Sequence, residues 1–148
     1  MKIIVYTDGG ARGNPGPAGI GAVICNEKGQ VMKKYGEFLG DNMTNNEAEY
    51  NAVIFALKKL KLLLGKEKTK QAEVEIRADS ELMVKQMNGI YKLSEKRIQD
   101  FFIIIWNLKT EFKSVFFKHI PREQNKEADA MVNQALDIQT KQNSKSLF

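Results

Sequence analysis

Cysteine and histidine are nearly absent from this chain, which has one of each among its 148 residues. The single cysteine, Cys25, excludes an internal disulfide and a zinc site built from cysteines. We expect Cys25 to be a small buried residue in a strand, because a free cysteine usually behaves as a small apolar side chain. No cluster of histidines and cysteines exists, so a metal site here must depend on oxygen ligands.

Long hydrophobic runs are missing as well. The amino-terminal sequence MKIIVYTDGG reaches turn residues too soon for a signal peptide or a membrane span, so we expect a cytoplasmic protein with no membrane partner. No repeat or long linker divides the chain, and its hydrophobic fraction of 43% suits one globular domain. We assign that domain to residues 1–138 and expect a flexible tail at residues 139–148, which are mostly polar.

Acidic residues are outnumbered by basic ones, and the net charge is +5. A basic surface suits a polyanionic partner, because neutralising phosphates releases their counterions. Charge alone does not identify the partner, since many basic proteins bind no nucleic acid.

Hydrophobic periodicity predicts an α/β domain. The first strand is apolar on both alternating faces, as in a central strand that is covered on both sides. The glycine-rich and proline-rich segment at residues 9–19 predicts a loop. Strands are expected at residues 2–8, 20–25, 30–38, 74–78 and 114–120. The order of strands and helices, βββαβααβα, indicates a mixed sheet with helices packed on it.

The helices have recognisable starts and faces. Asn45 or Asn46 can cap a long helix, whose apolar stripe predicts a buried face, and residues 65–71 are expected to be a solvated connection. A second helix opens near Ser80. Two more are expected at residues 94–112 and from about Asn125 to Asp137. The stripe of the long helix consists of Val53, Ala56, Leu57, Leu60 and Leu64.

Two acidic residues stand at the ends of predicted strands. Asp8 precedes the glycine-rich segment, where an acid often only starts a turn. Asp79 follows the fourth strand, where it could cap the next helix, but Ser80 is available for that role. Neither position identifies a functional residue when it is taken alone.

Two further acids lie on predicted helices. Glu49 shares the apolar stripe of the long helix, whereas Glu47 falls on the solvent side. A carboxylate that faces a core needs a partner or a metal ion, although the first turn of a helix also favours acids. Asp129 borders the apolar face of the last helix, and a solvated helix acid explains it equally well.

The four acids together indicate more than each does alone. Functional residues of a parallel or mixed sheet gather at the carboxyl ends of its strands. Clustered carboxylates repel one another, and their pKa values rise unless a cation relieves them. Oxygen ligands favour Mg²⁺, Mn²⁺ or Ca²⁺, and two such ions can promote hydrolysis of a phosphodiester.

The sequence resembles type 1 ribonuclease H over residues 1–137. The resemblance rests on four blocks in one order: YTDGGARGNPGPAGIGAVI, TNNEAEYNAVIFAL, ADSELMVKQMNG and PREQNKEADAMVNQA. It implies a ribonuclease H-like fold, whose five-stranded mixed sheet has three antiparallel strands followed by two parallel ones, with helices on both faces. It also implies that Asp8, Glu49, Asp79 and Asp129 bind metal.

The resemblance further implies an endonuclease that cuts the RNA strand of an RNA–DNA hybrid and leaves 5′-phosphate and 3′-hydroxyl ends. Two Mg²⁺ ions are expected per active site, with Mn²⁺ as a possible substitute, no small-molecule cofactor and a monomeric chain. Our hypothesis is that Asp8 bridges both ions, Glu49 and Asp79 complete one site, and Asp129 completes the other.

Contacts to the hybrid are also implied. Gly9, Gly10 and Ala11 would offer backbone contacts to 2′-hydroxyls, the group that separates RNA from DNA. Thr44, Asn45 and Asn46 match positions that touch the DNA strand, and one of the three would also cap the helix. The remaining substrate contacts are assigned to Asn14, Lys85 and Arg122.

Two departures from the family pattern stand out. The basic insertion that many members carry after the third acid is missing, and Lys85, Lys92, Lys96 and Arg97 would replace it only in part. The mobile histidine of many members is missing too, since His119 lies on the fifth strand; Arg122 or Glu123 would fill that space.

Two alternative functions stay open. One is a non-catalytic hybrid-binding module of the same fold, and the other is an enzyme that also cleaves double-stranded RNA. The four acids argue against the first, because a binder gains nothing from clustered negative charge beside phosphates.

Overall fold

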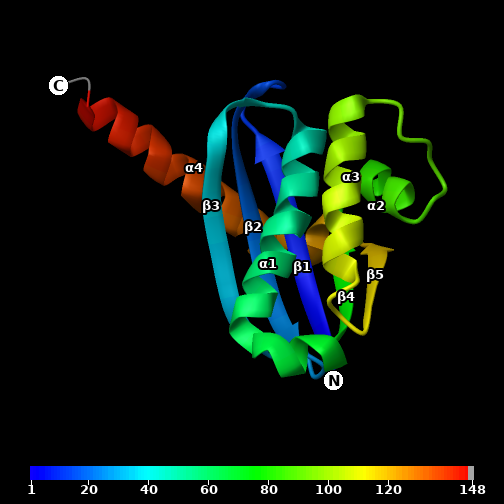
Figure 1. Cartoon of the computed structure of the whole chain (residues 1–148). Coiled ribbons are helices and arrows are strands. Elements are labelled where there is room, and N and C mark those ends of the chain that lie inside the picture. The colour runs from blue at the N-terminus through cyan, green and yellow to red at the C-terminus, as the bar shows by residue number, and fades with distance from the viewer. Residues whose placement is uncertain (147–148) are drawn as a thin grey trace.

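The computed structural model describes the backbone of residues 1–146 and side chains through Asn143. Its centre is a five-stranded sheet in the order β3-β2-β1-β4-β5 (Figure 1). The first three strands are antiparallel to their neighbours, while β1, β4 and β5 run parallel, as expected. The strands are β1 (Lys2–Ala11), β2 (Gly16–Asn26), β3 (Val31–Met43), β4 (Glu73–Ala78) and β5 (Ser114–His119).

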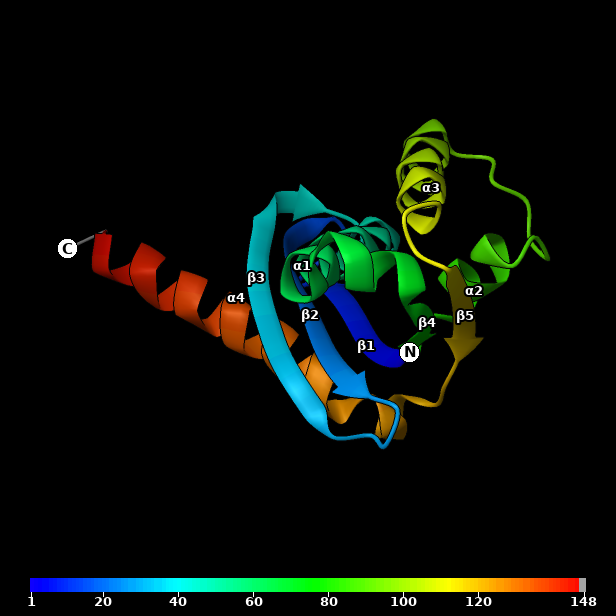
Figure 2. The same cartoon turned by 60° about the horizontal axis from the view of Figure 1, so that its bottom comes forward.

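Helices cover both faces of this sheet. Figure 2 shows α1, α2 and α3 on one side and α4 crossing the other side beneath β1, β2 and β3. The helices are α1 (Asn45–Gln71), α2 (Glu81–Met87), α3 (Lys96–Lys109) and α4 (Lys126–Ser146), with a short 3-10 helix, η1 (Arg122–Gln124), before α4. None of the helices in residues 1–146 combines the length and the apolar composition that crossing a membrane requires.

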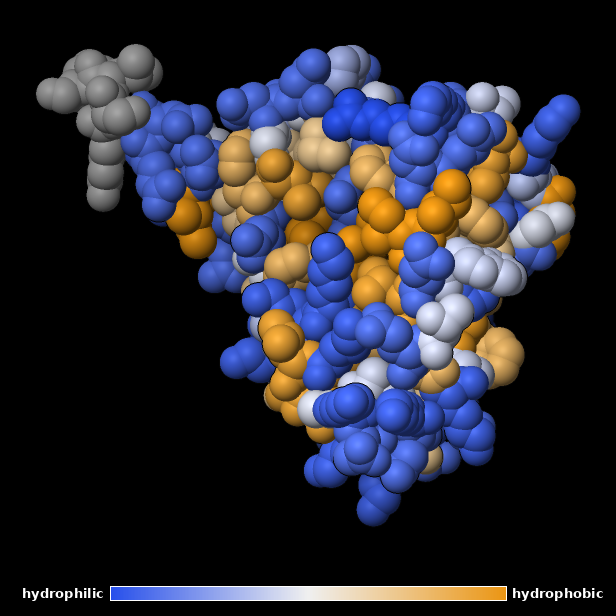
Figure 3. Space-filling view, in the orientation of Figure 1, coloured by the Kyte–Doolittle hydropathy of each residue, from blue (hydrophilic) through white to orange (hydrophobic). Residues whose placement is uncertain are grey.

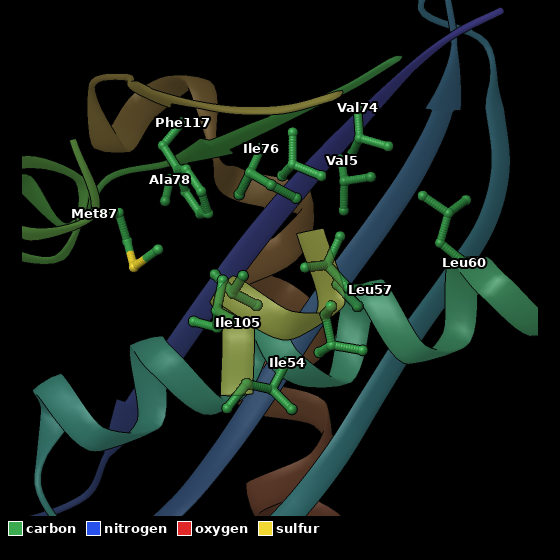
Figure 4. Close-up of a cluster of buried hydrophobic side chains, with 14 of the residues drawn as sticks. Val5, Ile54, Leu57, Leu60, Val74, Ile76, Ala78, Met87, Ile105 and Phe117 are labelled. Carbon is green, nitrogen blue, oxygen red and sulfur yellow. The ribbon is translucent and has the colours of Figure 1, made fainter. Parts of the chain in front are cut away.

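The central strand β1 has a hydrophobic core on each side. Val5 faces the larger core, where Val5, Val74 and Ile76 point from the sheet toward Leu57 of α1 (Figure 4). Ile4 points the other way, into a smaller core that includes Cys25 and packs against α4. The predicted two-sided burial of this strand is confirmed, and so is the burial of Cys25.

The loop predicted at residues 9–19 is wrong. β1 continues to Ala11 and β2 already begins at Gly16, so only residues 12–15 connect the strands. Gly9, Gly10 and Ala11 pair with Ile20, Gly19 and Ala18 across the hairpin. Local composition favoured a loop, but the ladder of backbone hydrogen bonds to β2 and the helices packed on both faces keep this segment extended.

The amino-terminal end of α1 confirms a cap among Thr44, Asn45 and Asn46, but the cap is Thr44 rather than an asparagine, and the environment of Glu47 differs from the prediction. The cap is Thr44, whose hydroxyl accepts the Glu47 N–H at 3.1 Å, while the Glu47 carboxylate accepts the Thr44 N–H at 3.1 Å. Glu47 is therefore buried rather than solvated, and it also forms an ion pair with Arg97 of α3 at 2.8 Å. The predicted stripe is confirmed at four of its five positions, which are buried: Val53, Ala56, Leu57 and Leu60.

Two segments predicted to be irregular are helical. Residues 66–71 continue α1 after a kink at Gly65, whose φ of 78° is a conformation that glycine adopts without steric cost. The last helix does not end near Asp137 but extends to Ser146, and its end projects past β3 (Figure 1). The flexibility of residues 139–148 stays a prediction, and residues 147–148 lie outside the described part of the chain.

Candidate active site at the carboxyl ends of β1 and β4

A pocket of about 520 Å³ opens where β1 and β4 end. All four acids predicted from the sequence line it. Two arginines, Arg12 and Arg122, are the only basic residues among the described residues of its lining. When all four acids are ionised the lining is net negative, so a phosphate group needs additional positive charge to enter.

Three of the acids converge closely. Asp8, Glu49 and Asp79 each offer one carboxylate oxygen, and these oxygens lie within 4.8 Å of one another. Asp8 and Glu49 are buried, and the side chain of Asp79 is only 10% exposed. This spacing suits a shared cation, because carboxylates without one would repel at such distances.

The parallel pairing of β1 and β4 places two of these acids side by side. The register ends at the Thr7–Ala78 pair, so Asp8 and Asp79 are the next residues along their strands. Ser80 takes the cap of α2, with its hydroxyl accepting the Met83 N–H at 3.2 Å. Asp79 is therefore free of the capping role, as the sequence indicated.

Close packing of α1 on β1 places the third acid. A Cβ atom at Gly9 would lie 2.3 Å from the carbonyl carbon of Ala48 and 2.6 Å from the backbone nitrogen of Glu49. Only glycine allows α1 to approach the strand this closely, and the approach puts Glu49 beside Asp8. The burial predicted for Glu49 is confirmed.

Burial and mutual repulsion raise the pKa values of all three acids. Burial, followed by the negative charge of Asp79, raises the pKa of Asp8 from 3.8 to about 7. Burial and the charge of Asp8 raise the pKa of Glu49 well above its usual value. Burial also raises the pKa of Asp79, although the positive charge of Arg122 opposes this effect. One Glu49 oxygen, Oε2, is buried without a hydrogen-bond partner.

Asp129 lines the same pocket from α4, where it is exposed. It does not belong to the group of closely spaced oxygens found in the described residues. It lies beside Asp8 nonetheless, because its charge and its carboxylate hydrogen bond both raise the pKa of Asp8. The structure thus brings three acids together and leaves the fourth near two of them, Asp8 and Asp79.

Some of the residues predicted to contact the substrate are joined by hydrogen bonds at the edge of the pocket. The Ala11 N–H donates to Asn45 Oδ1 at 2.9 Å, and the Asn45 N–H donates to Asn14 Oδ1 at 3.0 Å. A contact from Ala11 to a hybrid would therefore need a backbone group other than its N–H. Asn46 also lines the pocket, and its Oδ1 is buried without a hydrogen-bond partner.

The other predicted contacts are more dispersed. Thr44 serves as the helix cap. Lys85 forms an ion pair with Glu81 and lies outside the pocket lining. Arg122 is 90% exposed at the rim, with Nε 3.9 Å from Asp79 Oδ2. His119 is exposed on β5, as expected, and its charge lowers the pKa of Asp79.

Sequence analysis missed Asn125 and Asn133, which both contact the segment around Asp129. Asn133 lies one helical turn after Asp129 and lines the same pocket, with Nδ2 3.4 Å from Asp129 Oδ2. The spacing of four residues on a helix was a signal that could have found it. Asn125 could not be found this way, because its partner is distant in the chain.

Comparisons with known proteins agree on one family. Residues 6–135 match the family described as reverse transcriptase-like. The solved structure of LC11-RNase H1 in complex with an RNA/DNA hybrid superposes with a TM-score of 0.88, has 48% sequence identity, and covers 93% of this chain and 99% of its own. The chain belongs to the type 1 ribonuclease H family.

Curated ribonuclease H relatives are longer than this chain. Ribonuclease HI of Halobacterium salinarum is 35% identical over 136 residues, which are 92% of this chain and 65% of that protein. A bifunctional protein of Mycobacterium tuberculosis is 34% identical over 138 residues, which are 93% of this chain and 36% of that protein. The chain thus spans between about a third and just under two thirds of these relatives. The predicted ribonuclease H fold, a five-stranded mixed sheet with helices on both faces, is confirmed.

Proposed function

We propose that this chain is a metal-dependent endonuclease that hydrolyses the RNA strand of RNA–DNA hybrids. The observation that carries the proposal is the close group of Asp8, Glu49 and Asp79, with one Glu49 oxygen buried and unpaired. A buried carboxylate oxygen without a partner is costly, and a bound cation removes that cost. The relative solved with an RNA/DNA hybrid supports the choice of substrate.

The donor set fits two divalent cations. Only carboxylate oxygens converge in the pocket, and hard oxygen ligands favour Mg²⁺, with Mn²⁺ as a substitute. Asp8 would contact both ions, Glu49 and Asp79 would complete one site, and Asp129 the other. When bound, the ions would supply an activated water and stabilise the leaving oxygen, giving 5′-phosphate and 3′-hydroxyl ends.

The side chains of the pocket have complementary tasks. The raised pKa values mean that Asp8 and Glu49 bind protons more tightly than ordinary carboxyl groups do in the absence of cations, and cation binding would favour release of these protons. Arg122 and Arg12 are the basic residues of the pocket lining, so they would contact phosphates of the hybrid, although Arg12 also pairs with Asp137 at 2.7 Å.

Selectivity for RNA would come from the strand surface beside the acids. A Cβ at Gly10 would meet only Val132 Cγ1, at 3.8 Å, so the bare backbone there leaves room for a sugar. The 2′-hydroxyl distinguishes RNA from DNA, and we assign its recognition to backbone groups of Gly9 and Gly10. The side chain of Asn46 lines the pocket, where it would contact the DNA strand.

One assay tests the proposal. End-labelled RNA–DNA hybrid, RNA duplex and DNA duplex are incubated with the protein and Mg²⁺, and the D8N variant serves as the matched control. We expect cleavage of the hybrid's RNA strand, no cleavage of the DNA duplex, and hybrid binding without cleavage by D8N. Hybrid that is retarded but left uncut by the native protein would favour a non-catalytic binding module. Equal cleavage of the RNA duplex would widen the substrate class.

A further inference from the structure

Asn125 sits at the junction between η1 and α4 and is only 1% exposed. We propose that Asn125 is a positioning residue that sets where Asp129 stands relative to Asp8. The inference rests on the proposed nuclease function, in which both acids hold cations. A buried polar residue at the start of the helix that carries Asp129 is well placed for this task.

Two hydrogen bonds connect the segments that carry the two acids. Asn125 Nδ2 donates to the backbone oxygen of Thr7, the residue before Asp8, at 2.9 Å. The backbone N–H of Asp129 donates to the oxygen of Asn125 at 3.1 Å. One residue therefore joins the end of β1 to the first turn of α4, across 118 positions in the sequence.

The orientation of this side chain departs from the usual role of asparagine before a helix. An asparagine in that position normally turns its Oδ1 toward a backbone N–H of the first turn. Here Oδ1 is buried without a hydrogen-bond partner, while Nδ2 holds the strand. The side chain thus leaves Oδ1 without a hydrogen bond while Nδ2 bonds to Thr7. This orientation indicates that the link to β1 stabilises the structure more than a helix cap by Asn125 would.

Close packing against glycine sets the height of α4 above the sheet. A Cβ at Gly21 would lie 2.1 Å from the backbone oxygen of Ala128, so α4 lies directly on the backbone of β2. Figure 2 shows α4 crossing the strands at this point. Exposed ion pairs also hold α4, with Arg12 2.7 Å from Asp137 and Lys34 of β3 3.8 Å from Glu127. The Asn125–Thr7 bond differs from them because it is buried and holds α4 at the residue next to Asp8.

The position of Asp129 depends on the Asn125–Thr7 bond more than the positions of the other acids do. Asp8, Glu49 and Asp79 are held in close packing around the end of β1, whereas Asp129 is exposed. Its carboxylate also accepts a hydrogen bond from Asn133 Nδ2 at 3.4 Å, but Asn133 moves with the same helix. A shift of α4 would therefore carry Asp129 and Asn133 away from Asp8 together.

The test compares N125A and N125S with a matched control, N88A. Asn88 is a suitable control because its Nδ2 also donates to a strand carbonyl, that of Phe117 at 3.2 Å, but it lies outside the pocket. The N125S variant places a residue that favours the N-cap before α4, so it protects against simple loss of folding. Each variant is measured for kcat, for KM, for the Mg²⁺ concentration at half-maximal rate, and for the rise in Tm on adding Mg²⁺.

We expect both Asn125 variants to lose about tenfold or more in kcat, as residues that orient metal ligands do, with KM changed less than about twofold. The half-saturating Mg²⁺ concentration should rise, and the Mg²⁺-dependent rise in Tm should shrink. N88A should lower Tm without changing the Mg²⁺ response. In a D129A background, N125A should cause no further loss of kcat, because the residue acts through Asp129.

Several results would overturn the inference. One is that the Asn125 variants behave like N88A. Another is that N125A lowers kcat further in the D129A background, by the same factor as in the native protein. The third is that neither Asn125 variant folds, which would make Asn125 a purely structural residue. If the native protein cleaves no hybrid, the proposed function is wrong, whatever Asn125 does. The rise in Tm on adding Mg²⁺, compared between the native protein and the Asn125 variants, then still decides whether Asn125 positions Asp129.

Discussion

The pKa of Asp8, raised to about 7, couples protonation at the active site to the stability of the fold. The unfolded chain holds this carboxyl near its ordinary value of 3.8, so the folded protein binds the proton more tightly. Between the two pKa values, the free energy of unfolding therefore falls as the pH rises. Glu49 has its pKa shifted in the same direction and adds to this fall.

We expect the metal-free protein to lose on the order of 2–4 kcal/mol of stability between about pH 4 and pH 7. The D8N variant should lose much less over the same range, because its amide does not ionise. Urea unfolding in EDTA at several pH values measures the difference. Equal pH dependence of the native protein and D8N would show that Asp8 does not carry this energy.

Gly9 allows a second prediction at the same scale. A G9A variant places its Cβ against the backbone of Ala48 and Glu49, which must move away. We expect a loss of at least about 2 kcal/mol of stability and of nearly all cleavage, because Glu49 is displaced from Asp8. G40A is the control, since no atom lies within 4 Å of a Cβ at that position. A G9A variant with native stability and activity would contradict the role assigned to this close contact.

At the scale of elements, each acid of the pocket belongs to a different segment. Asp8 follows the part of β1 that pairs with β4, Glu49 lies in the first turns of α1, and Asp79 follows β4. Asp129 lies in the first turn of α4. The site therefore forms only when the helices on both faces dock on the sheet, which couples its geometry to the whole core.

The helix α4 consists of two parts that differ in packing. Val132 and Leu136 are buried against the sheet, whereas residues 141–143 are exposed. The second part projects beyond β3 (Figure 1). A helix without tertiary contacts has little stability of its own in water.

We expect amide hydrogens of residues 139–146 to exchange much faster than those of residues 128–136, because only the latter are stabilised by the core. Hydrogen exchange followed by mass spectrometry measures the exchange rates of both segments in one sample. For the same reason, removal of residues 141–148 should leave the cleavage rate unchanged. Equal protection of the two segments would show that the projecting part has a partner that stabilises it.

At the scale of the whole molecule, positive charge gathers away from the pocket. Residues 58–70 of α1 contain six lysines and one acid, Glu67. This half of the helix is far from Glu49, which lies in its first turns. Figure 3 shows hydrophilic side chains at the lower end of the molecule, where this part of α1 lies. The net charge of +5 therefore does not describe the surface beside the acids.

We expect the hybrid to be bound weakly and with moderate salt dependence. If only two to four phosphates are neutralised, affinity should fall about 10- to 100-fold between 50 and 200 mM salt. Titration of labelled hybrid with the D8N variant measures the slope without cleavage. A much steeper slope would mean that the lysines of the second half of α1 also contact the nucleic acid.

The sequence by itself determined the parts of this protein that depend on local patterns. Alternating apolar residues predicted β1 as a strand covered on both sides, and periodicity of three and four predicted the buried stripe that places Glu49 inward. Four motifs in one order predicted the family and its sheet. Such signals lie within a few residues of one another, so they can be read without knowing the fold.

Only the tertiary structure decided the features that join distant segments. Composition predicted a loop after Asp8, but pairing with β2 and packing of α1 keep Gly9 in a strand. Helical periodicity placed Glu47 in solvent, but the capping box and Arg97 bury it. Asn125 carried no signal, because its partner Thr7 is 118 positions away. These outcomes depend on contacts between elements, and no local pattern of residues contains that information.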